Sequence, residues 1–74
     1  MSVVPQLPAH VVLRKLKQAG FEIVHQRGSH VKLRHPHSRR MVTVPMHPGD
    51  FGKKLIGRIF KQAGLSLDDF LTLL

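Results

Sequence analysis

The stretch SHVKLRH, residues 29–35, decides the fold of this chain because polar and apolar residues alternate along it. Successive side chains of a β-strand point to opposite faces of the sheet, so Val31 and Leu33 share one face. The opposite face carries His30, Lys32 and Arg34. We therefore predict a half-buried strand with an apolar inner face and a cationic outer face.

The segments on both sides of this strand also have the composition of strands. Residues 21–26 combine Phe, Ile and Val directly after a glycine, and Arg27 with Gly28 supplies a turn. After a loop over 35–38, residues 39–44 alternate again until Pro45 ends strand pairing. These segments predict three consecutive strands in an antiparallel meander.

Two amphipathic helices are expected to flank the strands. The first begins around Pro8, which suits a first helical turn, and stops at Gly20. The second runs over 51–63 with Asp50 as its N-cap and stops at the following glycine. Gly57 costs this helix roughly 1 kcal/mol relative to alanine, so we expect it to mark a close approach of helix and sheet. The apolar stripes are Val12, Leu13, Leu16 and Ala19 in the first helix and Leu55, Ile56, Ile59, Phe60 and Ala63 in the second.

The two ends of the chain extend this plan. Residues 1–7 precede a proline and contain another, which predicts an extended arm. Ser66 followed by Asp69 resembles a capping box, which predicts a short C-terminal helix. The apolar residues of that helix are Phe70, Leu71 and Leu74. No repeat or composition shift marks a second domain, so we expect residues 1–74 to form one α/β two-layer sandwich of helix-strand-strand-strand-helix order.

The charge of the chain is strongly positive. Twelve Lys and Arg oppose four Asp and Glu among 74 residues, which gives a formal net charge of +8. Such an imbalance favours a polyanionic partner, nucleic acid or anionic lipid, over a merely soluble basic surface. No stretch approaches the ~18 apolar residues of a membrane span, and no export signal is visible, so we expect no membrane association. The absence of cysteine excludes disulfides and Cys-based metal sites, and an intracellular, reducing compartment is expected.

Six histidines are the candidates for chemistry in a chain that lacks cysteine and tyrosine. His30 is the best placed, because Lys32 and Arg34 project from the same strand face and offer a docking surface for a phosphate. An imidazole exchanges protons near neutral pH, so His30 is a candidate catalytic residue, with an ordinary solvated histidine as the alternative. His47, in a Pro-Met-His-Pro loop, is a second candidate acid, base or phosphate donor.

The remaining polar residues give weaker signals. His35 and His37 share a tight loop where a two-histidine metal site is conceivable, but no third ligand lies nearby and the positive charge opposes a cation. His10 and His25 are expected to be surface or packing residues. Ser29 has no paired acid in view for nucleophilic serine chemistry.

The cationic residues on and beside the predicted strands form a basic tract. We expect this tract to hold phosphates in position without recognising the base sequence. Gly28 lets a ligand approach the backbone closely, or it is simply a hairpin glycine. For each cation the alternative is solvated surface charge. The candidate phosphate-binding residues are Arg27, Gly28, Ser29, Lys32, Arg34, Arg39 and Arg40.

The chain resembles the HicA toxin family in three runs that keep the family order and spacing, namely GFEIVHQRGSHVKLRH (20–35), RRMVTVPMH (39–47) and KQAGLSLDDFL (61–71). The resemblance implies a double-stranded-RNA-binding-domain-like fold and cleavage of mRNA in a prokaryotic cytoplasm, without metal or other cofactor. It also implies neutralisation by a HicB-type antitoxin protein from the same operon. The catalytic histidine of the family matches His30, and the basic tract becomes the expected RNA-binding surface. The chain departs from many relatives at Lys54-Leu55, where they have Gly-Thr, which leaves the contacts of that helix start open.

Two functions of different classes follow. The first is a ribonuclease toxin with His30 as catalytic base. The second is a non-catalytic RNA-binding module, which reads duplex RNA by shape and needs no histidine. A histidine on the basic face favours the enzyme. The chain has no Trp or Tyr and its four Phe are expected to be mostly buried, which argues against a base-stacking platform, and no helix-turn-helix pair supports DNA binding.

Overall fold

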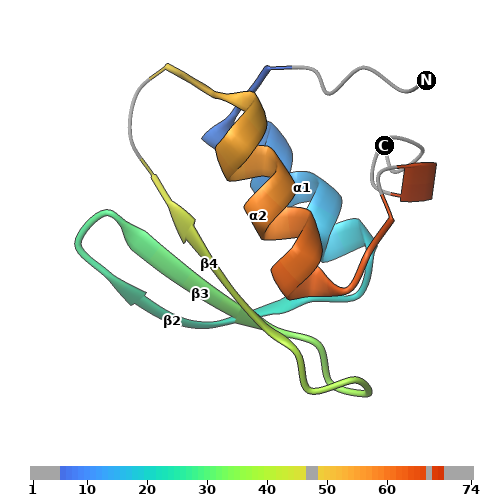
Figure 1. Ribbon diagram of the computed structural model, residues 1–74. Helices are drawn as coiled ribbons and strands as arrows, with labels where there is room; N and C mark the ends of the chain where they lie inside the picture. Colours follow the sequence, from blue (N-terminus) through green and yellow to red (C-terminus); the bar gives the residue numbers. More distant parts are fainter. Residues whose placement is uncertain (1–5, 47–48, 67, 70–74) are drawn as a thin grey trace.

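The computed structural model describes residues 6–46, 49–66 and 68–69. The elements in chain order are β1 (Leu7–Pro8), α1 (Ala9–Gln18), β2 (Glu22–Arg27), β3 (His30–Arg34), β4 (Met41–Pro45), β5 (Asp50–Phe51) and α2 (Lys53–Ala63). Strands β2, β3 and β4 form an antiparallel sheet in that order, and β1 pairs with β5. Both long helices lie on one side of the three-stranded sheet (Figure 1). The predicted two-layer α/β sandwich with an antiparallel meander is confirmed.

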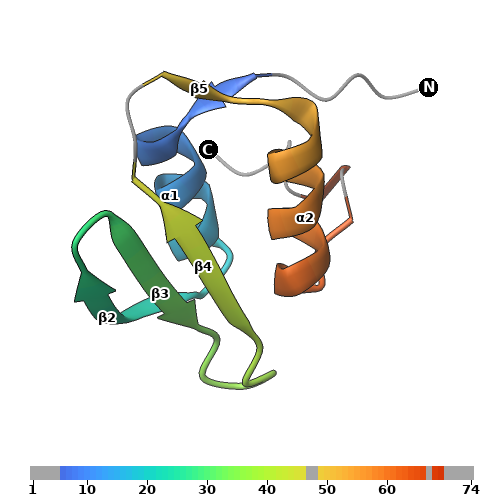
Figure 2. The same cartoon turned by 60° about the vertical axis from the view of Figure 1, so that its left-hand side comes forward.

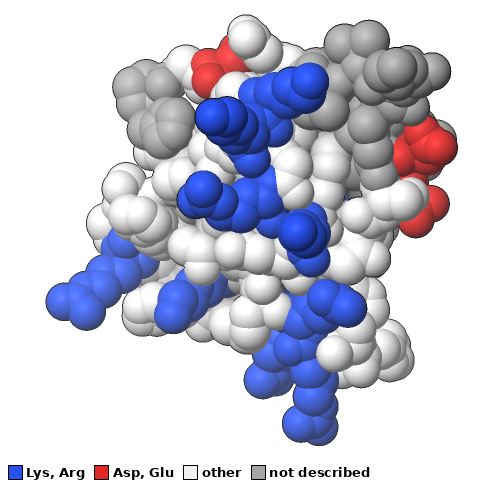
Figure 3. Space-filling view, in the orientation of Figure 1, with Lys and Arg blue, Asp and Glu red and all other residues white. Residues whose placement is uncertain are grey.

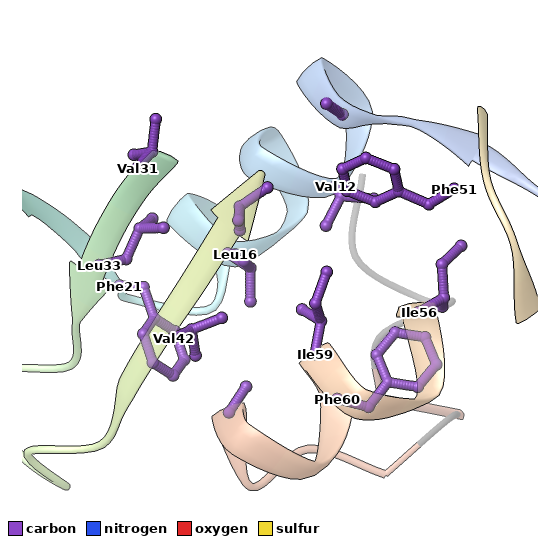
Figure 4. Close-up of a cluster of buried hydrophobic side chains, with 13 residues drawn as sticks. Val12, Leu16, Phe21, Val31, Leu33, Val42, Phe51, Ile56, Ile59 and Phe60 are labelled. Atoms are coloured by element: carbon purple, nitrogen blue, oxygen red, sulfur yellow. The ribbon is translucent and has the colours of Figure 1, made fainter. Parts of the chain in front are cut away.

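The core lies between the helices and the inner face of the sheet (Figure 4). The predicted alternation holds, because Val31 and Leu33 in β3 are buried while His30, Lys32 and Arg34 are exposed. Leu13, Ala19 and Leu55 pack against this core and are half-buried. The buried residues are Ala9, Val12, Leu16, Phe21, Val31, Leu33, Val42, Val44, Phe51, Ile56, Ile59, Phe60 and Ala63. Both predicted helix stripes are therefore confirmed.

Each long helix stops at a glycine in the left-handed region, as predicted. Gly20 has a φ of 104° and Gly64 a φ of 71°. After α1, the amide of Phe21 donates to the carbonyl of Leu16 and the amide of Gly20 donates to that of Lys17, both at 3.0 Å. The end of α2 repeats this pair of bonds at 3.1 and 3.2 Å. This is the Schellman motif, which needs a residue with positive φ and so explains why glycine marks both ends.

The helix starts differ from the prediction. Helix α1 begins one residue later than expected, with Pro8 in an extended conformation before it. Helix α2 begins directly after Gly52. This N-cap residue has no side chain, so the helix has no side-chain cap hydrogen bond. Asp50 is not the N-cap, because it belongs with Phe51 to β5, which pairs with β1 (Figure 2). Strands of two residues have no periodicity, so the sequence pattern did not predict this pairing.

Gly57 does not mark a close approach of helix and sheet, which corrects the prediction. It is exposed, and a β-carbon placed there would meet no atom within 4 Å. The crowded glycines are instead the helix stops, since a β-carbon at Gly20 would lie 2.8 Å from Nε2 of His35 and one at Gly64 would overlap Arg40. An amphipathic helix buries only one side, and Gly57 lies on the other.

The chain beyond α2 is described in part. The amide of Asp69 donates to Oγ of Ser66 at 3.1 Å, which is the bond expected of a capping serine. Residues 68 and 69 are helical. The rest of the predicted C-terminal helix, with Phe70, Leu71 and Leu74, and positions 1–5 of the predicted arm lie outside the described residues. Within the described ranges, no helix is long and apolar enough to cross a membrane.

Candidate functional site

The face of the three-stranded sheet that points away from the helices is built of cross-strand rows. Directly opposed residues of an antiparallel pair project to the same face, so the register assigns each row. His30, for example, lies opposite Arg27 on one side and Pro45 on the other. We call these residues the outer face. Its rows are Arg27–His30–Pro45, His25–Lys32–Thr43 and Glu22–Arg34–Met41.

One end of the outer face is hollowed. An open depression of about 530 Å³ lies beside the turn between β2 and β3, and we call it the turn depression. It is lined by His25, Arg27, Gly28, Ser29, His30 and Lys32. All but His25 are candidate residues from the sequence, so the fold brings most of the predicted site together.

The turn itself is a two-residue connection. Arg27 pairs with His30, which leaves Gly28 and Ser29 as the loop, and Gly28 has a φ of 58°. Two-residue hairpin turns that match the twist of the strands need positive φ at the first central residue, and glycine adopts it without strain. The carbonyl of Ser29 accepts a hydrogen bond from the amide of Met46, so the end of β4 is tied to the turn.

His30 begins β3 on the exposed side of the strand. Among the residues that the structure describes, none forms a hydrogen bond with its imidazole. Lys32 lies on the same side of β3, two residues further, and Arg27 lies directly opposite. His30 is therefore exposed and has one cationic residue across from it and another along its own strand.

His25 is the residue that sequence reasoning missed. The register between β2 and β3 shifts between Ile23 and His25, so Val24 is the extra residue of a β-bulge. Without this shift, His25 would share the inner side with Ile23. The bulge turns it to the outer face, opposite Lys32. No residue in this segment signals a bulge, so alternation alone did not place His25.

The other predicted cations lie away from the turn depression. Arg34 is on the outer face at the far end of β3. Arg39 and Arg40 belong to the loop before β4 and not to the strand predicted from residue 39, because Arg39 has a φ of 60° that interrupts extended backbone. The side chain of Arg40 lies against Gly64 at the end of α2. The predicted basic tract is thus divided between the two ends of the sheet.

His35 is engaged in the loop that follows β3. Its Nδ1 accepts hydrogen bonds from the amides of His37 and Ser38, both at 3.2 Å. Its ring meets Phe21 edge-on with a centroid distance of 5.2 Å. The centroid of His37 is 5.8 Å away, but the described part of the chain contains no group of three His, Asp or Glu that could hold a metal ion. His35 therefore closes the β3–β4 loop onto the turn after α1.

His47, the second candidate from the sequence, lies outside the described residues. The residue before it in the chain, Met46, is the one bonded to Ser29 beside the turn depression. His10 is exposed on α1, as expected.

The arrangement in the turn depression suits an anion that undergoes proton transfer. Arg27 and Lys32 supply charge-assisted hydrogen bonds of the kind that hold phosphate oxygens. An imidazole at the position of His30 is of the kind that can accept or donate a proton at a group carried by such an anion. Gly28 has no side chain, so a ligand can approach its backbone closely.

A family model matches most of the chain. Its description is HicA toxin of bacterial toxin-antitoxin, and the match covers residues 10–65 of the 74. This range contains the whole three-stranded sheet, the turn depression and α2. The comparison with curated proteins finds no match.

Proposed function

Because the chain belongs to the HicA toxin family of bacterial toxin–antitoxin systems, we propose that it is an endoribonuclease that cleaves mRNA without a metal ion. The observation that carries the proposal is the turn depression, which the exposed His30 lines together with Arg27, its cross-strand partner, and Lys32, two residues along the same strand. The family also implies an antitoxin as partner of this chain.

The proposed reaction uses the nucleophile that RNA carries. His30, as general base, removes the proton of a 2′-hydroxyl, whose oxygen attacks the adjacent phosphorus. The bond to the 5′-oxygen breaks, which leaves a 2′,3′-cyclic phosphate on the upstream product and a 5′-hydroxyl on the downstream product. Arg27 and Lys32 stabilise the negative charge that develops on the phosphorane oxygens. The chain needs to supply only proton transfer and charge stabilisation.

A proton donor for the leaving 5′-oxygen completes the mechanism, and two histidines are candidates. His47 is proposed from its loop in the sequence, and His25 from its place in the turn depression. A substrate with sulfur in place of the 5′-oxygen distinguishes them, because a thiolate leaves without protonation. If a histidine acts as the acid, its alanine variant loses activity on ordinary RNA and regains activity on the sulfur substrate. A variant of His30, the base, is not rescued.

Cleavage of a defined RNA in the presence of a chelator tests the proposal, with the matching DNA as control. We expect the RNA alone to be cut, and His30→Ala to reduce the rate by about 10²–10⁴-fold. A requirement for added divalent metal, equal cutting of DNA, or full activity of His30→Ala would contradict it. Tight RNA binding without any cleavage would favour the non-catalytic RNA-binding module.

We further propose that a HicB-type antitoxin inhibits by covering the turn depression. An exposed cationic face attracts an acidic protein surface as readily as RNA. Antitoxin and RNA are therefore expected to compete in a binding assay with labelled RNA. A toxin–antitoxin complex that binds RNA as tightly as the toxin alone would show that inhibition does not act by occlusion.

A further inference from the structure

Helix α2 carries a line of cations on the side opposite to the core. Lys54, Arg58 and Lys61 follow one another at four- and three-residue spacing, which places them in one row on the helix surface. All three are exposed. Figure 3 shows a group of Lys and Arg side chains over α2, in the centre of the view. The helix itself contains no acidic residue that would balance this charge.

Gly57 lies among these cations. Lys53 and Lys54 precede it by four and three residues and Lys61 follows it by four, so all are its neighbours on the helix surface. Arg58 is adjacent in the chain. The position is exposed, and a β-carbon there would meet no atom within 4 Å. The result is a bare patch of helix backbone among Lys53, Lys54, Arg58 and Lys61, which we call the glycine patch.

The fold gives no reason for a glycine at this position. Glycine is among the poorest helix formers, and no neighbouring atom needs the space that it leaves. Like charges four residues apart, such as Lys54 and Arg58, destabilise a helix further. A local arrangement that lowers stability without a gain in packing is typical of a functional site.

The composition of the glycine patch fits phosphates better than a protein surface. The centre of a protein–protein interface is enriched in aromatic residues and Met and depleted in Lys. The glycine patch has four cationic side chains and no exposed apolar one. Lys and Arg are the side chains that contact nucleic-acid phosphates, and the missing side chain of Gly57 leaves room for a phosphate between them.

We propose that the glycine patch binds the phosphate backbone of RNA as a second contact, separate from the turn depression. The inference rests on the proposed function, in which RNA is the substrate. The glycine patch raises the affinity for RNA of any sequence, because contacts to phosphates hold a nucleic acid without recognising its bases.

The position of the glycine patch allows one RNA strand to reach both sites. The patch belongs to the helix layer, whereas the turn depression opens on the outer face of the sheet. The β3–β4 loop lies next to the C-terminal end of α2 in both views (Figures 1 and 2). It contributes Arg39 and Arg40, and Arg40 reaches Gly64 at the end of α2. A flexible single strand can run from the turn depression along the outer face to these arginines at the other end of the sheet, and from there to α2.

The test uses binding of a labelled single-stranded RNA of twenty nucleotides, measured by fluorescence anisotropy in a His30→Ala background that prevents cleavage. Gly57→Gln fills the patch without a change of charge and improves helix propensity. The loss of one phosphate contact lowers affinity roughly fivefold at 0.1 M salt, given a log–log slope of about −0.7 per contact for single strands. We expect this loss with an unchanged or higher melting temperature.

A double variant measures the electrostatic part. Lys54→Gln with Arg58→Gln removes two contacts, so affinity falls roughly 25-fold at 0.1 M salt and the slope flattens by about 1.4. Arg14→Gln with Lys17→Gln removes the same charge from α1 and is expected to change affinity far less. A four-nucleotide RNA, too short to span both sites, should lose less affinity in these variants than the twenty-nucleotide RNA, because it can bind at the turn depression alone.

The outcomes separate this inference from the proposed function. RNA affinity that is unchanged in both α2 variants, with cleavage by the parent chain intact, overturns the inference alone. Variants that lose antitoxin affinity but keep RNA affinity assign the glycine patch to a protein partner and also overturn it. A parent chain that neither binds nor cleaves RNA overturns both proposals.

Discussion

The two ends of β3 each carry a histidine, and their surroundings differ. His30 begins the strand beside a glycine turn, and its imidazole has no hydrogen bond within the described residues. His35 follows the strand, accepts two backbone amides and packs edge-on against Phe21. The hydrogen bonds of each ring, rather than the residue type or the surrounding charge, decide which histidine is available for proton transfer.

The backbone shows the same contrast. The β2–β3 turn places a glycine, Gly28, at positive φ, whereas the β3–β4 loop places Arg39 there. An L-residue in this region is strained, and the loop is held by the bond from the amide of Arg39 to the carbonyl of His35 at 2.8 Å. One end of the sheet is thus open and unstrained, and the other is strained and fixed by hydrogen bonds within its own loop.

The largest expected effect separates the two histidines by activity. We expect His30→Ala to lower the rate of RNA cleavage by about 10²–10⁴-fold with a change in unfolding free energy of no more than about 0.5 kcal/mol. His35→Ala, measured below its melting temperature, should keep most of the activity. Initial cleavage rates of both variants measure the loss of activity, and thermal melts show that both variants are folded at the assay temperature. An equal loss in a folded His35→Ala protein would place the chemistry at the wrong end of β3.

The next effect separates the two histidines by stability. His35→Ala removes the acceptor of two backbone amides and the ring contact with Phe21, so we expect a loss of about 1–3 kcal/mol in unfolding free energy. His35→Asn should recover part of it, because an Asn side chain accepts the amide two residues further along. Urea unfolding measures both variants. Stability equal to that of the parent chain would remove the structural role of His35.

A smaller effect concerns the charge beside His30. Lys32→Ala should flatten the log–log dependence of RNA affinity on salt by about 0.7 and weaken binding roughly fivefold at 0.1 M salt. Lys17→Ala, which removes one exposed charge from α1, is the matched control and should change the slope much less. Anisotropy titrations over a range of salt concentrations measure both slopes. Equal changes would mean that only total charge matters.

The smallest effect concerns the strained loop. Arg39→Gly relieves a positive φ that costs an L-residue about 1–2 kcal/mol, partly offset by the greater freedom of glycine in the unfolded chain. We expect a net gain of about 0.5–1 kcal/mol in unfolding free energy, measured by urea unfolding. A loss of stability would show that the Arg39 side chain holds the loop.

The sequence predicted those parts of the structure that depend on local pattern. Alternation in β3 assigned His30 and Lys32 to one exposed face, and the structure confirms this placement. Gly20 and Gly64 were recognisable as helix stops because a single residue with positive φ completes each motif.

The predictions that were wrong or missing concern features that depend on tertiary contacts. The pairing of β1 with β5 joins segments too short to show a period, so the sequence pattern favours Asp50 as a helix cap, whereas the structure places it in β5. The bulge at Val24 moved His25 into the turn depression without any sign in the sequence. Gly57 was expected at a tight contact, whereas the structure places it on the exposed side of α2.

The chemistry of the cleaved ends tests the central claim most directly. Cleavage of a defined RNA, followed by mass spectrometry of both fragments, is compared with cleavage of the same RNA carrying one 2′-deoxynucleotide at the cut site. With His30 as base on the 2′-hydroxyl, we predict a 2′,3′-cyclic phosphate and a 5′-hydroxyl, and no cut at the deoxynucleotide. A 5′-phosphate with a 3′-hydroxyl, or cleavage that survives the 2′-deoxy substitution, would contradict the account, because water and not the 2′-hydroxyl would then be the nucleophile.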